Sequence, residues 1–172
     1  MTETDTTHTG EKAELLERLA RQRQFLRYTT RDLTDEQAAQ RTCASELCLG
    51  GIIKHVTRME RRWAGFLSEG PAAMEQNERS QADHAASFRM DEGDTLTGLL
   101  ADYAEAARQT SEVVTTLPNM DESQELPPAP WFPPGTRWSH RQVLIHVICE
   151  TAQHSGHADI VRESLDGAKT MG

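Results

Sequence analysis

The sequence predicts an all-α protein, a four-helix bundle with a long proline- and aromatic-rich loop before the last helix. Four segments carry apolar side chains every three or four residues, the spacing that places them on one face of an α-helix. Six of the seven prolines lie within residues 118–134, and proline disfavours both helix interiors and central strands. Four helices joined by connections of varied length favour a bundle.

The first two expected helices flank a short capped turn. Leucines recur along residues 11–32 with charged residues on the opposite side, which predicts the first long helix. Thr34 and Gln37 have the spacing of a capping box and predict a helical turn that ends near Gln40. Residues 47–67 form the second expected long helix, whose inward stripe is Leu49, Ile52, His55 or Val56, Met59, Trp63 and Phe66.

Glycine and proline mark the ends of the second helix. Gly50 and Gly51, near its start, permit another helix to approach closely. Gly70 and Pro71 end it, and residues 71–93, which have no sustained apolar period, are expected to form a surface connection with at most a helical turn.

The last two helices enclose the proline-rich loop. The third is expected to begin at Asp94, a good N-cap, and to close before the first proline of the loop. Ser139 and Gln142 form a second capping box, which predicts a last helix up to about Leu165. A loop as long as 118–138 is usually functional or disordered, and its aromatic residues favour a packed lid: Trp131, Phe132 and Trp138.

Length and charge limit the classes of function. The 172 residues fit one domain, expected to span 11–172 after a disordered tail at 1–10. A formal net charge of −9 argues against nucleic acid as a partner, since phosphate binding needs a concentrated basic surface. No apolar run is long enough to span a membrane, and no signal peptide is evident. Three cysteines without a CxxC pair are typical of a reducing compartment, so a soluble cytoplasmic protein is expected.

Polar residues within the last helix indicate a metal ion. If 139–166 is helical, one stripe consists of Val143, Val147, Glu150, His154, His157 and Val161. Burying a carboxylate and two imidazoles is costly unless they are paired or coordinated. Glu150 and His154 lie one turn apart and can bind one ion, with His55 from the second helix as the third ligand. Two histidines and a carboxylate suit hydrolytic zinc and non-haem iron(II), so the ligand set does not choose the metal.

Other roles for these histidines remain open. His157 lies one turn beyond His154 and can replace Glu150 or complete a fourth position, and His146 borders the stripe as a ligand or as a neighbour of one. A lone histidine on an apolar face, such as His55, is more often a hydrogen-bonded core residue than a ligand.

Two further alternatives concern the carboxylate and the cysteines. Glu150 can form an ordinary ion pair with Arg58 or Arg62. Cys48 and Cys149 are candidate nucleophiles, but Cys149 lies about 100° around the helix from Glu150, so a small buried cysteine is expected there.

Two segments resemble a known family. The patterns LCLGGIIKHVTRMERRW at 47–63 and RWSHRQVLIHVICETAQHSGHADIVRESLDG at 137–167 resemble the DinB-like superfamily of metal-binding four-helix bundles, in the branch similar to mycothiol-dependent S-transferases. The family's metal triad, one histidine on the second helix and two ligands four residues apart on the last, falls on His55, Glu150 and His154. Many members have histidine where this chain has Glu150, which changes the charge of the site.

The resemblance also implies an activity. It implies a divalent metal, often zinc or nickel, transfer of a low-molecular-weight thiol of mycothiol type to a small-molecule electrophile, and frequent homodimers. In that hypothesis the aromatic residues of the 118–138 loop wall the substrate pocket, and Arg58 and Arg137 contact carboxylates. The alternatives are a metal-dependent hydrolase that uses metal-bound water and a non-enzymatic bundle that binds a metal or ligand.

Overall fold

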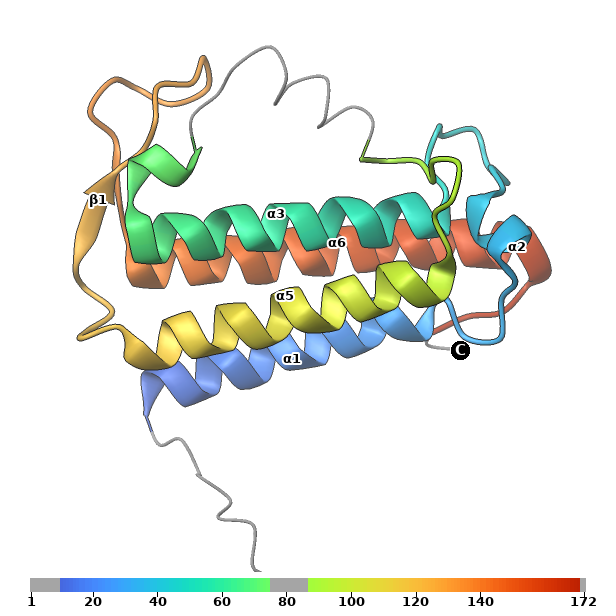
Figure 1. Cartoon of the computed structure of the whole chain (residues 1–172), viewed down its shortest axis with the longest axis horizontal. Coiled ribbons are helices and arrows are strands. Elements are labelled where there is room, and N and C mark those ends of the chain that lie inside the picture. The colour runs from blue at the N-terminus through green and yellow to red at the C-terminus, as the bar shows by residue number, and fades with distance from the viewer. Residues whose placement is uncertain (1–9, 75–86, 171–172) are drawn as a thin grey trace, which may run out of the picture.

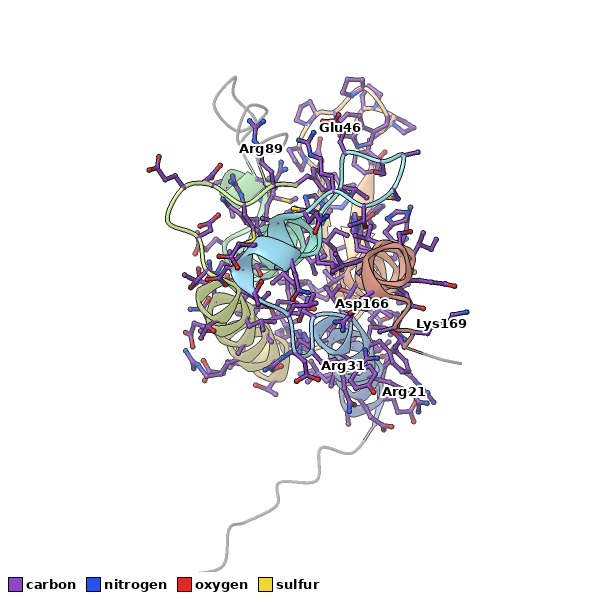
Figure 2. All side chains as sticks on the ribbon, turned by 90° about the vertical axis from the view of Figure 1, so that its right-hand side faces the viewer. Arg21, Arg31, Glu46, Arg89, Asp166 and Lys169 are labelled. Atoms are coloured by element: carbon purple, nitrogen blue, oxygen red, sulfur yellow. The ribbon has the colours of Figure 1, made fainter. Side chains whose placement is uncertain are left out.

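The computed structural model describes residues 10–74 and 87–170 and has four long helices in two layers. In Figure 1, α3 and α6 form the upper layer and α1 and α5 the lower one, and Figure 2, which looks nearly along the helix axes, shows side chains filling the space between them. The all-α bundle is therefore confirmed. The helices are α1 (Glu11–Tyr28), α3 (Leu49–Glu69), α5 (Leu96–Thr116) and α6 (His140–Asp166).

The direction of the helices determines which ends meet. α1 and α6 run from left to right in Figure 1, whereas α3 and α5 run from right to left. α3 therefore ends at the opposite end of the bundle from the start of α5. The connection leaves α3 through a 3₁₀ turn, η1 (Pro71–Met74), and residues 75–86 of the predicted surface connection lie outside the described residues.

Shorter elements lie at the two ends of the bundle. α2 (Asp35–Ala39) is the predicted capped turn before α3, and both sides of its capping box are formed. The proline-rich loop starts and ends in a small antiparallel sheet of β1 (Ser123–Glu125) and β2 (Arg137–Ser139), with Gln124 opposite Trp138. This pairing is not predictable from the sequence, because three-residue strands are too short to show an alternation of polar and apolar residues.

Two predicted helix ends are wrong. α1 stops at Tyr28 rather than at residue 32, because the hydroxyls of Thr29 and Thr30 bond to carbonyls three residues back and Asp32 has a positive φ of 58°. The N-cap of α5 is Thr95, whose side chain accepts the Gly98 amide. The neighbouring Asp94 instead accepts a hydrogen bond from Lys54 of α3 at 2.7 Å.

The caps of α6 agree with the sequence. Ser139 accepts the amide of Gln142, and the Gln142 side chain returns to the Ser139 amide. At the other end Gly167 adopts the left-handed conformation that stops the helix.

The apolar core has two clusters with an ion pair between them. On α1, Arg23 lies between Leu19 of one cluster and Leu26 of the other, and its guanidinium bonds to the fully buried Glu60 of α3. The cluster near the hairpin includes Trp63, Phe66, Leu67, Val114, Val143, Leu144 and Val147. The other includes Leu49, Ile52, Ile53, Val56, Leu99, Tyr103, Ala158 and Val161.

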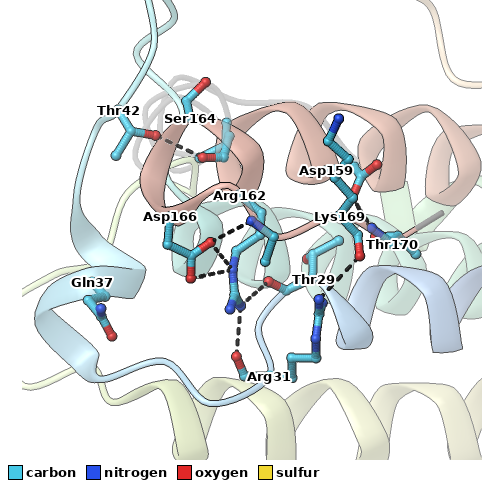
Figure 3. Close-up of polar contacts among 12 residues, drawn as sticks. Thr29, Arg31, Gln37, Thr42, Asp159, Arg162, Ser164, Asp166, Lys169 and Thr170 are labelled. Carbon is cyan, nitrogen blue, oxygen red and sulfur yellow. Dashed lines mark hydrogen bonds and ion pairs between the residues drawn. The ribbon is translucent and has the colours of Figure 1, made fainter. Parts of the chain in front are cut away.

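Hydrogen bonds from Arg162 connect the C-terminal end of α6 to the residues that follow α1. Its Nε donates to both carboxylate oxygens of Asp166, and its Nη1 donates to the carbonyls of Thr29 and Arg31 at 2.8 and 2.7 Å (Figure 3). The cation thereby satisfies carbonyls left open where α1 ends.

The structure bears only partly on the predicted N-terminal tail and on the predicted lack of a membrane-spanning segment. Apart from Gly10, the predicted tail at 1–10 lies outside the described residues. Among the helices of the described segments, none combines the length and apolar character that crossing a bilayer requires.

Candidate metal centre

α3 and α6 bring the three predicted ligands together. His55 comes from α3, and Glu150 and His154 come from α6 one helical turn apart. One ligand atom from each lies within 4.8 Å of the other two. His154 Nε2 is 3.7 Å from Glu150 Oε2, and the rings of His55 and His154 are 4.7 Å apart between centroids.

The two histidines are buried, whereas the carboxylate remains accessible. His55 and His154 are among the buried polar residues of the bundle. The Glu150 side chain keeps 30% of its surface exposed. The group therefore has a buried side formed by imidazoles and an open side at Glu150.

His55 is oriented by the segment that follows the undescribed residues. Ser87 Oγ lies 3.1 Å from His55 Nδ1, and the Phe88 ring stacks on the imidazole at 3.8 Å with an angle of 19° between planes. A hydroxyl at Nδ1 is the arrangement in which histidine coordinates metals through Nε2. Ser87 and Phe88 fall in the stretch that the sequence analysis treated as a surface connection, so this contact was missed.

Two glycines make that contact possible. A Cβ on Gly51 would lie 2.0 Å from the Phe88 carbonyl oxygen, and one on Gly50 would lie 2.3 Å from the Met90 sulfur. The glycine pair in the sequence predicted the close approach of another helix. In the structure Gly51 admits the Phe88 backbone and Gly50 the Met90 side chain instead, and the only sequence signal was the glycine pair itself.

Two further histidines of α6, His146 and His157, lie beside the group. His157 contacts His154 ring to ring at 5.4 Å and is not part of the three-residue group. His146 Nε2 is 4.0 Å from Glu150 Oε1, and its ring packs edge-on against Trp63 and at a tilt against Trp138. Burial lowers the pKa of His146, an effect that the Glu150 charge partly opposes.

A cavity of about 660 Å³ opens onto the exposed side of the group. His55 and Glu150 lie in its wall together with all three aromatic residues of the proline-rich loop. Trp138 stacks on Trp63 at 5.3 Å, Phe132 packs edge-on against Trp138, and Trp131 is 68% exposed. The loop therefore contributes to the cavity wall, as the sequence analysis predicted, with Trp131 the most open of its aromatics.

The arginines differ from the sequence-based expectation. Arg58 lines the cavity, but Arg137 belongs to β2 and donates to the Ser123 carbonyl at 2.5 Å. Arg62, considered earlier only as a partner for Glu150, also lines the cavity. The histidine nitrogens nearest to the Glu150 carboxylate are those of His154 and His146, at 3.7 and 4.0 Å.

One cysteine prediction is wrong. Cys149 is exposed, because it lies on the outer face of α6, away from Glu150. Cys48 is buried, with its thiol 3.8 Å from the Phe88 carbonyl.

The donor set fits a divalent metal. Imidazole and carboxylate ligands bind such ions at about 2.0–2.2 Å, and the 3.7 Å between His154 Nε2 and Glu150 Oε2 is short enough for both atoms to reach one ion. Three protein ligands beside a cavity leave a coordination position for a small molecule, the pattern of catalytic rather than structural metal sites.

Comparison with known families agrees with this geometry. The family model described as mycothiol-S-transferase matches residues 14–167, nearly the whole chain. No curated protein matches at significant similarity. Since the match covers α3, α5 and α6, most of α1 and every residue of the candidate metal centre, the chain belongs to the mycothiol-S-transferase family, as the resemblance in its second and last helices indicated.

Proposed function

We propose that this protein is a metal-dependent S-transferase that moves a low-molecular-weight thiol of mycothiol type onto a small electrophile. The observation that carries the proposal is the position of Glu150, which belongs both to the group of three ligands and to the wall of the cavity. A thiol and an electrophile can therefore meet at the metal position inside the cavity.

His55, Glu150 and His154 are the proposed ligands of the ion. The chemistry that a divalent cation supplies at such a position is loss of the proton from a coordinated thiol. Glu150 is the one anionic residue of the three, so the ligands leave part of a dication's charge uncompensated. In the overall reaction the sulfur bonds to an electrophilic carbon, the leaving group departs with its bonding electrons, and the thiol proton passes to solvent.

The cavity wall supports the same activity. Trp63 and Trp138 provide a flat apolar surface, and neighbouring apolar walls reduce the access of water to the reacting atoms. Ser87 holds His55 at Nδ1, which keeps the imidazole in one orientation as the substrate exchanges.

Elemental analysis of the purified protein tests the metal assignment. We expect stoichiometric zinc or nickel in the wild type, strong loss of metal in Glu150→Ala and His154→Ala, and retained metal in His157→Ala. His157 is the matched control because it contacts His154 but lies outside the group. Wild-type protein without stoichiometric metal would overturn the assignment, as would equal loss in all three variants.

A thiol-dependence assay tests the reaction class. The metal-loaded protein is incubated with monobromobimane and mycothiol, and with the electrophile alone, and adduct formation is followed by fluorescence. We expect turnover only with thiol and none in His154→Ala. Turnover of a hydrolysable ester without thiol would support the hydrolase instead, and inactivity toward both would favour a binding protein.

Two further expectations from the sequence remain predictions. A homodimer is tested by sedimentation of the metal-loaded protein, and a cytoplasmic location by fractionation of the native cells.

A further inference from the structure

Arg62 is a half-buried cation beside the cavity, and its contacts differ from those of the buried arginines. Arg23 is paired with Glu60 and Arg162 with Asp166. Arg62 donates from Nη2 to the Met74 carbonyl at 3.1 Å. Within segments 10–74 and 87–170, no carboxylate lies within ion-pair distance of its guanidinium.

Partial burial without a carboxylate partner has an energetic cost. Burial lowers the pKa of Arg62, yet an arginine side chain remains protonated at neutral pH in proteins. A charge removed from water is unfavourable unless another charge or strong acceptor compensates it. The Met74 carbonyl takes one of the five N–H donors, so the guanidinium has capacity for an anionic ligand.

The rest of the cavity wall indicates what kind of anion fits. Glu150 is the one carboxylate among its described lining residues, and it is already a proposed metal ligand. The wall also contains every tryptophan of the chain, Trp63, Trp131 and Trp138. A guanidinium presents a planar pair of donors that matches a carboxylate, and tryptophan faces favour flat apolar groups.

We infer that Arg62 anchors a carboxylate of the molecule that binds in this cavity, with a flat apolar part of that molecule lying against Trp63 and Trp138. The inference rests on the proposed function in one respect, that the cavity is the substrate site. The carboxylate belongs either to the electrophile or to the thiol, and the experiment separates these sources.

Intrinsic fluorescence reports on this cavity directly, because the protein's only three tryptophans line it. The zinc-loaded protein is titrated with two matched pairs of probes. One pair, 4-nitrobenzoate and 4-nitrobenzamide, represents an aromatic electrophile with and without charge. The other, N-acetylcysteine and its amide, represents the thiol. Quenching is corrected for absorption by the probe.

We expect at least one carboxylate probe to bind about tenfold or more tightly than its amide, the usual effect of a charge-assisted hydrogen bond. Arg62→Gln should remove that preference, and Arg62→Lys should retain part of it. Arg61→Gln is the matched control, because Arg61 immediately precedes Arg62 in α3, is exposed and faces Asp102. It should leave the preference intact.

The outcomes separate this inference from the transferase activity. The nitro probes need neither thiol transfer nor a leaving group, so an enzymatically inactive protein can still show the Arg62-dependent preference. The pair that loses its preference in Arg62→Gln identifies the source of the carboxylate. If both pairs keep their full preference in a folded, zinc-loaded Arg62→Gln protein, or if the wild type has none, the inference is wrong.

Discussion

At the scale of single residues, the Arg23–Glu60 pair is the main polar contact inside the core. Glu60 is fully buried, and Arg23 is nearly so, with Nε donating to Glu60 Oε2 at 3.3 Å. Burial, followed by the charge of Glu60, raises the pKa of Tyr103 well above its usual value, so this phenol stays neutral beside the carboxylate. A pair in this position favours one register of α1 against α3, because a shift would separate the two charges.

Removing one partner should therefore cost more than removing both. We expect Glu60→Leu to lower the free energy of unfolding by about 3–5 kcal/mol, because Arg23 is left buried without its counter-charge. The double variant Arg23→Met, Glu60→Leu should recover most of that loss. Urea unfolding measures both values. The exposed pair of Glu105 and Arg108 is the control, and Glu105→Leu should lower the free energy of unfolding far less than Glu60→Leu does. A double variant as unstable as the single one would contradict this account.

The Arg162–Asp166 pair should make stability depend on pH in acid. The hydrogen bond from Arg162 lowers the pKa of Asp166 below its usual value, so the folded state binds fewer protons than the unfolded one. The pair thus contributes its full stability above the unfolded pKa of about 4 and loses it as pH falls through the lower folded value. We expect the advantage of the wild type over Asp166→Asn in urea unfolding to shrink between pH 5 and pH 3. A difference that is constant with pH would contradict this.

The sequence predicted candidate ligands better than the residues around them. Glu150 and His154 are one helical turn apart, so helix geometry alone brings them together. His55 was found because it interrupts an apolar stripe. Ser87 and Arg62 left no such signal, since their positions depend on how distant segments pack, and a polar residue in a connection or on a helix surface is ordinary in sequence.

At the scale of elements, the two glycines at the start of α3 affect the position of residues around the candidate metal centre. Gly50 and Gly51 are unfavourable inside a helix, yet they let the Phe88 backbone and the Met90 side chain pack against α3. That approach puts Ser87 and Phe88 on His55. The two glycines thus lower the helix propensity of α3 but allow the contacts that orient His55, a proposed metal ligand.

Substituting Gly51 with alanine should therefore weaken metal binding. The new Cβ would meet the backbone of Phe88 at 2.0 Å, and a main-chain carbonyl cannot move aside as a flexible side chain can. We expect zinc affinity to fall by about 10–100-fold, the usual effect of losing a partner of a metal-binding histidine, as measured by competition with a chelating dye.

Gly156→Ala is the control for this substitution. Gly156 is also helical, but a Cβ there meets nothing within 4 Å. Its alanine variant should keep its zinc affinity and gain up to about 1 kcal/mol of stability from helix propensity. Equal zinc affinities in the Gly51 and Gly156 variants would exclude a role for the 87–90 contact.

Helix ends show where local rules fail. The capping boxes at Thr34 and Ser139 are both formed, because each needs only residues three apart. Asp94 is an equally good cap in sequence but is used by Lys54 instead, and the role passes to Thr95. The contact with Lys54 therefore determines that Thr95 rather than Asp94 caps the helix, and a tertiary contact of this kind cannot be recognised from a local sequence pattern.

At the scale of the whole molecule, the bundle was predictable because its helices are long and amphipathic, whereas the hairpin and the cavity were not. β1 and β2 are short and lie close to prolines, and the cavity depends on Trp138 of β2, which stacks on Trp63 of α3, and on Phe132, which packs against Trp138. The fold thus follows from periodicity within helices, and the site's surroundings follow from contacts between elements.

The relation between metal and fold gives a final prediction. Neither apolar cluster includes a proposed ligand, so the bundle should fold without metal. Metal would still stabilise it by joining α3 to α6, by about 2.7 kcal/mol at a free-metal concentration 100 times the Kd. For a chain of this size, that corresponds to a rise in Tm of roughly 5–10 °C. Thermal unfolding followed by circular dichroism, with zinc and with a chelator, measures the rise.

His154→Ala is the decisive comparison for that rise. The variant should remain helical, and its Tm should be the same with zinc and with chelator, because α6 has lost one of its two proposed ligands. An unchanged zinc-dependent rise in this variant would mean that zinc stabilises the protein at another position. Complete unfolding of the wild type on chelation would mean that the two clusters are insufficient without the ion and that the centre is structural. A rise confined to proteins with His55, Glu150 and His154 intact would tie the stabilisation to these three residues.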